Sequence, residues 1–195
     1  MKFRAFAFAL PPKRRSKTQE PLKNRGYAQS MSPSSADFHT MTRPLPDANA
    51  TVLLGAQLGR AARPGLVVLL DGPLGAGKTT LVQGFAVGIG ALKRAASPSF
   101  VLAHSYPGGR LPVWHLDLYR IETDTEIDDL DLDLYMPPDG VALIEWAERS
   151  SPRRWPLDVL MIRLDLATHG RIANIGCIDV EPRIALQTLN ALRAM

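Results

Sequence analysis

The chain has 195 residues, of which 46% are hydrophobic and 22% charged, a composition typical of a soluble globular protein with a substantial core. A single cysteine, Cys177, excludes an internal disulfide framework and a multi-cysteine zinc site, and it agrees with a cytoplasmic location. No apolar run approaches the about 20 residues that span a bilayer, so no membrane partner is expected.

The positive charge is concentrated near the N-terminus. The net charge is +4, but residues 1–40 hold eight Lys and Arg against two acidic residues. The remaining 155 residues hold 15 basic and 17 acidic residues, a net charge of −2. The main part of the chain therefore carries no general attraction for nucleic acid.

Residues 1–44 are predicted to be a basic, disordered tail. The stretches PPKRRSKTQEPLKNR and SMSPSSADFHT have a composition that buries little apolar surface. The alternative is that translation starts at Met31 or Met41 and that the tail is a gene-calling artefact. In both cases we expect one folded domain over residues 45–195.

The first elements of this domain are a helix, a strand and a second helix. Residues 48–62 have helical apolar spacing that ends at Arg63-Pro64-Gly65, and the apolar run at 66–70 predicts a strand buried on both faces. A helix is predicted over 78–92, with Gly84 and Gly88 allowing close packing on the sheet. Its inward face is expected to carry Leu81, Val82, Phe85, Val87 and Ile89.

Two hairpins and a further buried strand are predicted in the second half of the chain. One hairpin joins 99–106 to 110–119 across PGG, and the other surrounds THGR at 168–171. Between them lie a short acidic helix capped by Thr123 or Asp124 and an apolar strand at 140–146. A final amphipathic helix is expected over 182–192. Together these elements predict an α/β domain with a mixed sheet.

Residues 72–79, GPLGAGKT, match the pattern G-x-x-x-x-G-K-[ST] of a phosphate-binding loop. A buried strand enters this loop and an amphipathic helix leaves it, as nucleotide binding requires. The glycines let successive N–H groups point at a phosphate, the lysine reaches the β- and γ-phosphates, and the threonine hydroxyl ligates Mg²⁺. The predicted nucleotide contacts from this loop are Gly72, Gly75, Ala76, Gly77, Lys78 and Thr79.

Two acidic residues at predicted strand ends are candidates for holding magnesium or the attacking water. Glu145 follows VALI, and Asp117 follows VWHL. The alternative for Glu145 is a surface carboxylate beyond the strand end. The alternative for Asp117 is a structural partner of Arg120 or of a hairpin amide. On the strand that carries Asp117, His115 and Tyr119 share its face and are predicted to hold its carboxyl group in place.

Two further segments are weaker candidates. SPSF at 97–100 supplies hydroxyls of the kind that sense a γ-phosphate in switch-type nucleotidases, although an ordinary Ser-Pro turn is the alternative. The seven acidic residues between Glu122 and Asp133 are either a docking patch or a solvated surface.

The series GPLGAGKTT, SPSF, HLDLYR and LIEWAER closely resembles the TsaE family (formerly YjeE), over roughly residues 45–180. These are small bacterial P-loop ATPases with a mixed β-sheet flanked by helices. The resemblance implies ATP and Mg²⁺ as cofactors, Thr80 and Trp146 as further nucleotide contacts, and Ser99 in the position of the family's usual threonine. It also implies that Lys78, Asp117 and Glu145 serve ATP hydrolysis and that Thr79, Asp117 and Glu145 surround the metal.

The resemblance implies a function in tRNA modification. It predicts an ATPase required for the threonylcarbamoyl group on adenosine 37 of tRNAs that read codons beginning with adenine. TsaD and TsaB are the implied protein partners, and tRNA is contacted only through that complex. A small-molecule kinase of P-loop fold is the alternative, and the missing Asn-Lys-x-Asp motif argues against a GTPase. A nucleotide-binding module without turnover is a third possibility.

Overall fold

The structure is a computed structural model that describes residues 38–92, 102–150 and 155–195. Residues 1–37 of the predicted tail and the SPSF segment with Ser99 lie outside the described residues. In the part of the chain that is described, no helix is long and apolar enough to cross a membrane.

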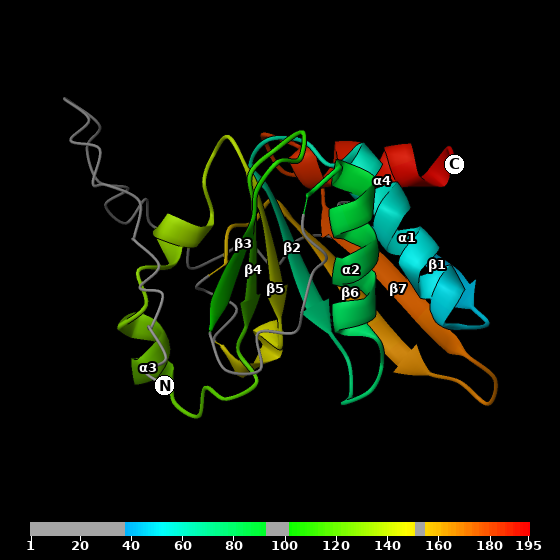
Figure 1. Cartoon of the computed structure of the whole chain (residues 1–195), viewed down its shortest axis with the longest axis horizontal. Helices are drawn as coiled ribbons and strands as arrows, with labels where there is room; N and C mark the ends of the chain where they lie inside the picture. The colour runs from blue at the N-terminus through cyan, green and yellow to red at the C-terminus, as the bar shows by residue number, and fades with distance from the viewer. Residues whose placement is uncertain (1–37, 93–101, 151–154) are drawn as a thin grey trace, which may run out of the picture. The chain divides into compact units, whose positions relative to one another are not determined.

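The described elements are seven strands, four α-helices and two 3-10 helices (Figure 1). The strands are β1 (Phe38–Leu45), β2 (Leu66–Asp71), β3 (Ala103–Tyr106), β4 (Val113–Asp117), β5 (Val141–Glu145), β6 (Val159–Leu166) and β7 (Arg171–Ile178). The helices are α1 (Ala48–Ala61), α2 (Lys78–Ile89), α3 (Asp124–Asp128), α4 (Ile184–Arg193), and the 3-10 helices η2 (Leu132–Tyr135) and η3 (Ala147–Arg149).

All seven strands form one mixed sheet in the order β1-β7-β6-β2-β5-β4-β3. The four central strands, β6, β2, β5 and β4, run parallel to one another, and antiparallel pairs lie at both edges of the sheet. Both predicted hairpins are confirmed, as β3–β4 and β6–β7. The carboxyl ends of β2, β4 and β5 therefore meet at one edge of the sheet, where ligands bind in open α/β sheets.

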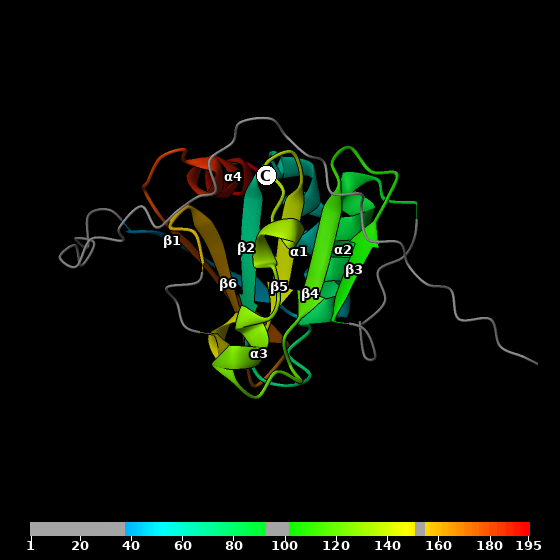
Figure 2. The same cartoon turned by 90° about the vertical axis from the view of Figure 1, so that its left-hand side faces the viewer.

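Helices cover both faces of the central strands. Helices α1, α2 and α4 lie on one face, and α3 lies on the opposite face (Figures 1 and 2). The two faces have separate apolar cores, and the side chains of β2 and β5 alternate between them. This double burial explains why both strands are continuous apolar runs.

Helices α1 and α2 pack against each other through glycines, which corrects the prediction that Gly84 and Gly88 pack on the sheet. A Cβ atom on Gly84 would lie 2.1 Å from the carbonyl oxygen of Val52, and one on Gly88 would lie 2.1 Å from that of Ala56. The glycines thus allow the two helix backbones to approach closely. Val87 was expected to face inward, but it is 65% exposed, since it lies on the side of α2 away from both α1 and the sheet.

Strand β1 begins before the predicted domain boundary at residue 45. Residues 38–44, which the sequence analysis assigns to the tail, pair with β7 along the strand's full length. The mixed polar composition of these residues and the presence of Pro44 did not predict a strand. Proline is tolerated in a strand at the edge of a sheet, and β1 is such a strand. In this strand Leu45 is buried in the core beneath α1.

Candidate nucleotide-binding site

The loop 72–77 joins β2 to α2 in a conformation that requires glycine. Gly72 has a φ of 132°, and a Cβ atom there would lie 2.2 Å from the carbonyl oxygen of Leu164. Gly77 is the N-cap of α2 with a φ of 102° and has no side chain to bond the N–H groups of the first turn. Those N–H groups and the positive end of the helix therefore face the loop, which is a phosphate-binding arrangement.

Lys78 is folded back into the loop at the start of α2. Its side chain is 4% exposed, and Nζ donates to the carbonyl oxygens of Gly72 at 2.6 Å and Pro73 at 3.1 Å. Nζ also lies 3.6 Å from the centre of the Trp146 ring, a cation–π distance. Burial lowers the pKa of Lys78, although the carboxylates nearby, Glu145 first among them, oppose this shift.

Glu145 contacts the threonine of the loop. The Thr79 hydroxyl lies 2.9 Å from Oε1 and 3.2 Å from Oε2 of Glu145, although the two residues are 66 positions apart. The contact forms because Glu145 ends β5, the parallel neighbour of the strand that enters the loop. Of the two predicted acids, Glu145 is the one that the structure places against the threonine.

His115 bonds to Glu145, so the prediction that it holds Asp117 is wrong. Its Nε2 lies 2.9 Å from Oε1 of Glu145, and its Nδ1 lies 3.0 Å from the hydroxyl oxygen of Tyr106. The reason is the register: the imidazole lies inside the sheet face under α2 and reaches the adjacent strand. Tyr119 follows the strand, and its backbone N–H does donate to Asp117 at 3.0 Å.

Asp117 lies beside Glu145, since the two residues are register partners at the ends of β4 and β5. Burial raises the pKa of Asp117, and the neighbouring charge of Glu145 adds to this rise. The carboxyl group is half-buried and faces the same edge of the sheet as the phosphate-binding loop. The two predicted acids are therefore brought together, with Glu145 nearer to the loop.

Trp146 occupies a strained position directly after β5. Its φ of 61° is in the left-handed region, a conformation that bulky residues rarely adopt. Residues held in such conformations cluster at functional sites. Its ring contacts Lys78 on one side and Tyr119 at 5.0 Å between ring centres, while the Arg149 guanidinium lies 5.6 Å from it. These contacts fix the indole over the lysine.

Three residues around the loop were missed by the sequence analysis. Asp71 directly precedes Gly72, Glu148 lies in η3, and Arg171 begins β7. Arg171 Nη2 donates to the carbonyl oxygen of Gly75 at 3.2 Å. Burial, and after it a hydrogen bond with Asp71, raises the pKa of Glu148 to about 7. The position of Asp71 beside the motif was a usable signal, whereas no pattern in the sequence pointed to Arg171.

The predicted site residues that are described all belong to this one edge of the sheet. Thr79 contacts Glu145, Lys78 contacts Trp146, and Asp117 lies on the strand beside Glu145. Ala76 is a fully buried residue of the loop, and Thr80 lies in the first turn of α2. Any contact of Ser99 lies outside the described residues.

The residues present fit a magnesium–nucleotide complex. In the described part of the chain, Asp71 Oδ1 and Arg171 Nε are buried without a hydrogen-bond partner, and both flank the loop. Buried polar atoms are normally paired, so these two point to a ligand with both donors and acceptors. Those described residues hold no group of three or more His, Cys, Asp or Glu placed to bind a metal. Protein-bound Mg²⁺ commonly takes one or two carboxylates together with substrate phosphates and water.

Comparisons with known proteins point to one family. The family model for the threonylcarbamoyl adenosine biosynthesis protein TsaE matches residues 45–173. The tRNA threonylcarbamoyladenosine biosynthesis protein TsaE of Nostoc sp. is 45% identical over 109 residues, which cover 54% of this chain and 67% of that protein. Its counterpart in Mycobacterium tuberculosis is 39% identical over 142 residues, covering 66% of this chain and 80% of that protein. The crystal structure of Bacillus subtilis YdiB superimposes with a TM-score of 0.67 at 28% identity, covering 80% of this chain and 97% of that one. This chain therefore belongs to the TsaE family of threonylcarbamoyl adenosine biosynthesis proteins.

Proposed function

We propose that this protein is a Mg²⁺-dependent ATP hydrolase that acts with TsaD and TsaB in forming threonylcarbamoyladenosine on tRNA. The observation that carries the proposal is the contact between Thr79 and Glu145 beside the phosphate-binding loop. A threonine of this loop bonded to an acid at the end of an adjacent buried strand is the arrangement by which P-loop NTPases hold magnesium. Membership of the TsaE family supports the pathway.

The loop and Lys78 would bind the phosphates of ATP. The amide groups of 75–80 and the start of α2 supply donors, and the Lys78 ammonium exchanges the loop carbonyls for phosphate oxygens. Thr79 and Glu145 would hold Mg²⁺, which would supply positive charge to neutralise the charge that develops during phosphoryl transfer. Trp146 keeps the lysine from turning into solvent.

The two acids would have different roles. Glu145, already bonded to Thr79, holds the metal or its water, and the half-buried Asp117 orients the attacking water. The raised pKa of Asp117 agrees with a carboxyl group that takes part in positioning a proton. Ser99 is proposed to contact the γ-phosphate.

The decisive experiment measures ATP turnover by the full chain with and without TsaD and TsaB. Turnover is expected to rise when the partners are present, and Glu145→Gln and Asp117→Asn are expected to lose kcat more than nucleotide affinity. Asp139→Asn is the matched control, since Asp139 is an exposed acid at the opposite end of β5. ATP consumption that rises with a small-molecule acceptor instead would indicate a kinase.

A further inference from the structure

We propose that His115 and Tyr106 are positioning residues that orient Glu145 for its metal through a buried chain of hydrogen bonds. This role rests on the proposed function, because it assigns a task to the Glu145 carboxylate. It adds His115 and Tyr106 to the site. The sequence predicted that His115 holds Asp117, and it predicted no role for Tyr106.

The chain of hydrogen bonds crosses three neighbouring strands. Tyr106 ends β3, His115 is central in β4, and Glu145 ends β5. The successive distances are 3.0 Å from the Tyr106 hydroxyl to Nδ1, 2.9 Å from Nε2 to Oε1 of Glu145, and 2.9 Å from that oxygen to the Thr79 hydroxyl. This series of hydrogen bonds therefore ends on Glu145 and Thr79, both of which are predicted metal ligands.

All three protein groups are removed from solvent. The exposed fractions are 0% for His115, 2% for Glu145 and 4% for Tyr106. A carboxylate at such a depth needs hydrogen bonds in place of water, and the described contacts provide them from one side through His115 and from the other through Thr79. Water cannot replace the imidazole in this packed core.

The chemistry of the groups sets the direction of each bond. A carboxylate only accepts, so Nε2 of His115 carries a hydrogen and donates to Glu145. With the hydrogen on Nε2, Nδ1 of the neutral ring accepts, so the hydroxyl of Tyr106 donates to it. The bond to Tyr106 thus selects the Nε2–H tautomer, as hydrogen bonds behind metal ligands commonly do.

This arrangement distinguishes the two oxygens of Glu145. Oε1 accepts from both His115 and Thr79, whereas among the described residues Oε2 has only the longer contact of 3.2 Å with Thr79. Holding Oε1 prevents rotation of the carboxylate and leaves Oε2 directed toward the loop. Oε2 is accordingly the oxygen assigned to the metal or its water.

A first experiment determines the tautomer by ¹⁵N NMR of the histidine rings in the full chain. The chain has four histidines, and His115→Gln identifies the resonances of His115 by their loss. We expect a protonated Nε2 and an unprotonated Nδ1, with the Nδ1 resonance shifted in Tyr106→Phe. A ring protonated on Nδ1 instead, or insensitive to Tyr106→Phe, would overturn the proposal.

A second experiment compares the Mg²⁺ dependence of turnover with TsaD and TsaB present. His115→Leu is expected to raise the half-saturating Mg²⁺ concentration and lower kcat by about tenfold or more, with Mg²⁺-free nucleotide affinity unchanged. His115→Gln, whose amide reaches Glu145, should recover part of the loss. Tyr106→Phe keeps the ring and should cost about fivefold. His169→Gln, at an exposed turn position, is the control.

The outcomes separate this proposal from the proposed function. A wild-type chain that does not hydrolyse ATP with its partners would overturn the function, while the NMR result still decides the hydrogen-bond chain. Normal wild-type turnover with unaltered Mg²⁺ dependence in His115→Leu and Tyr106→Phe would overturn the positioning role alone. Thermal unfolding identifies a variant that fails to fold, and in that case the volume-conserving Tyr106→Phe decides.

Discussion

Lys78 shows how a single residue of the loop depends on a distant part of the chain. Its ammonium is held by loop carbonyls on one side and by the ring of Trp146 on the other. Trp146 in turn keeps its unusual backbone conformation with an N–H bond to the carbonyl of Leu70, 3.0 Å away. The lysine is thus pre-positioned within reach of an incoming phosphate.

Replacing Lys78 with alanine is expected to abolish ATP hydrolysis. The change removes the cation that stabilises charge on the transferred phosphoryl group, an effect that costs about a hundredfold or more in kcat. Turnover with TsaD and TsaB gives the measurement, and unfolding temperature shows that the variant is folded. Retained turnover would contradict the whole scheme for the site.

Glu148 gives the site a dependence on pH. Its pKa is raised from 4.5 to about 7 by partial burial and by its hydrogen bond with Asp71. Because the folded state holds this proton more tightly than the unfolded chain, stability contributed by the group is present below pH 4.5 and is lost as pH rises to about 7.

Glu148→Gln should therefore flatten the decline in stability between pH 4.5 and about 7. The glutamine can keep a hydrogen bond to Asp71 without a proton to lose. Unfolding free energies measured by denaturant across this range give the slope, and the effect is modest because Glu148 is exposed. An unchanged slope in the variant would show that Glu148 titrates near its ordinary pKa.

Among the elements, the α1–α2 pair depends most on residue size. Gly55 and Gly59 of α1 lie against the backbone of α2, and Gly84 and Gly88 of α2 lie against α1. Because glycine has no Cβ atom, the two helix backbones are in direct contact, and this contact positions α2 and the lysine at its start. Glycine in a helix costs stability on its own, so the close approach accounts for its presence.

Gly84→Ala is expected to destabilise the protein by about 1–3 kcal/mol, although alanine is the better helix former. The new methyl group would lie 2.1 Å from the carbonyl oxygen of Val52 and would separate the helices. Chemical denaturation measures the change. Gln83→Ala is the control, since Gln83 is the exposed neighbour of Gly84 on the same helix and should have little effect.

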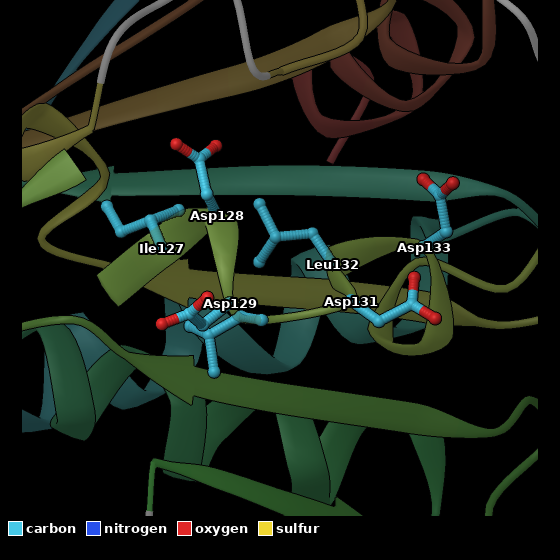
Figure 3. A pocket seen from close by; sticks show the side chains of 7 residues that line it. Ile127, Asp128, Asp129, Asp131, Leu132 and Asp133 are labelled. Atoms are coloured by element: carbon cyan, nitrogen blue, oxygen red, sulfur yellow. The ribbon is translucent and has the colours of Figure 1, made fainter. Parts of the chain in front are cut away.

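At the scale of the whole molecule, acidic residues gather on the face of the sheet away from α1 and α2. Helix α3 and η2 place Asp128, Asp129, Asp131 and Asp133 around a shallow pocket that Ile127 and Leu132 also line (Figure 3). Thr123 caps α3, as expected from the sequence, with its hydroxyl accepting from the N–H of Glu126. If TsaD and TsaB are the partners, as we propose, this acidic segment is our candidate surface for docking them.

Reversing Asp129, Asp131 and Asp133 to lysine is expected to weaken association with TsaD and TsaB at low salt. The new lysines would repel a positively charged partner surface that the acidic segment attracts. Added salt should reduce the difference in affinity between the variant and the wild-type chain. Titration calorimetry of the full chain measures the affinity. Asp139→Lys with Glu181→Lys changes exposed charges elsewhere, and affinities equal to that control would dismiss the surface.

What the sequence determined by itself was local. The phosphate-binding loop lies in consecutive residues, and its strand and helix have apolar patterns that depend on neighbouring positions. The apolar runs at 66–70 and 140–146, both hairpins and the cap at Thr123 were therefore confirmed. The motifs also sufficed for the family.

Only the tertiary structure decided which distant residues meet. The bond from His115 to Glu145 depends on β4 lying beside β5 in one register, and the bond from Glu145 to Thr79 depends on β5 lying beside β2. Neither neighbour relation is encoded in a local pattern, because strand order follows from how helices cover both faces. The same holds for Arg171 above the loop and for β1, whose partner β7 lies at the far end of the chain. Residue types and their spacing thus predicted the chemistry of the site, while packing across the sheet determined which side chains contact each other.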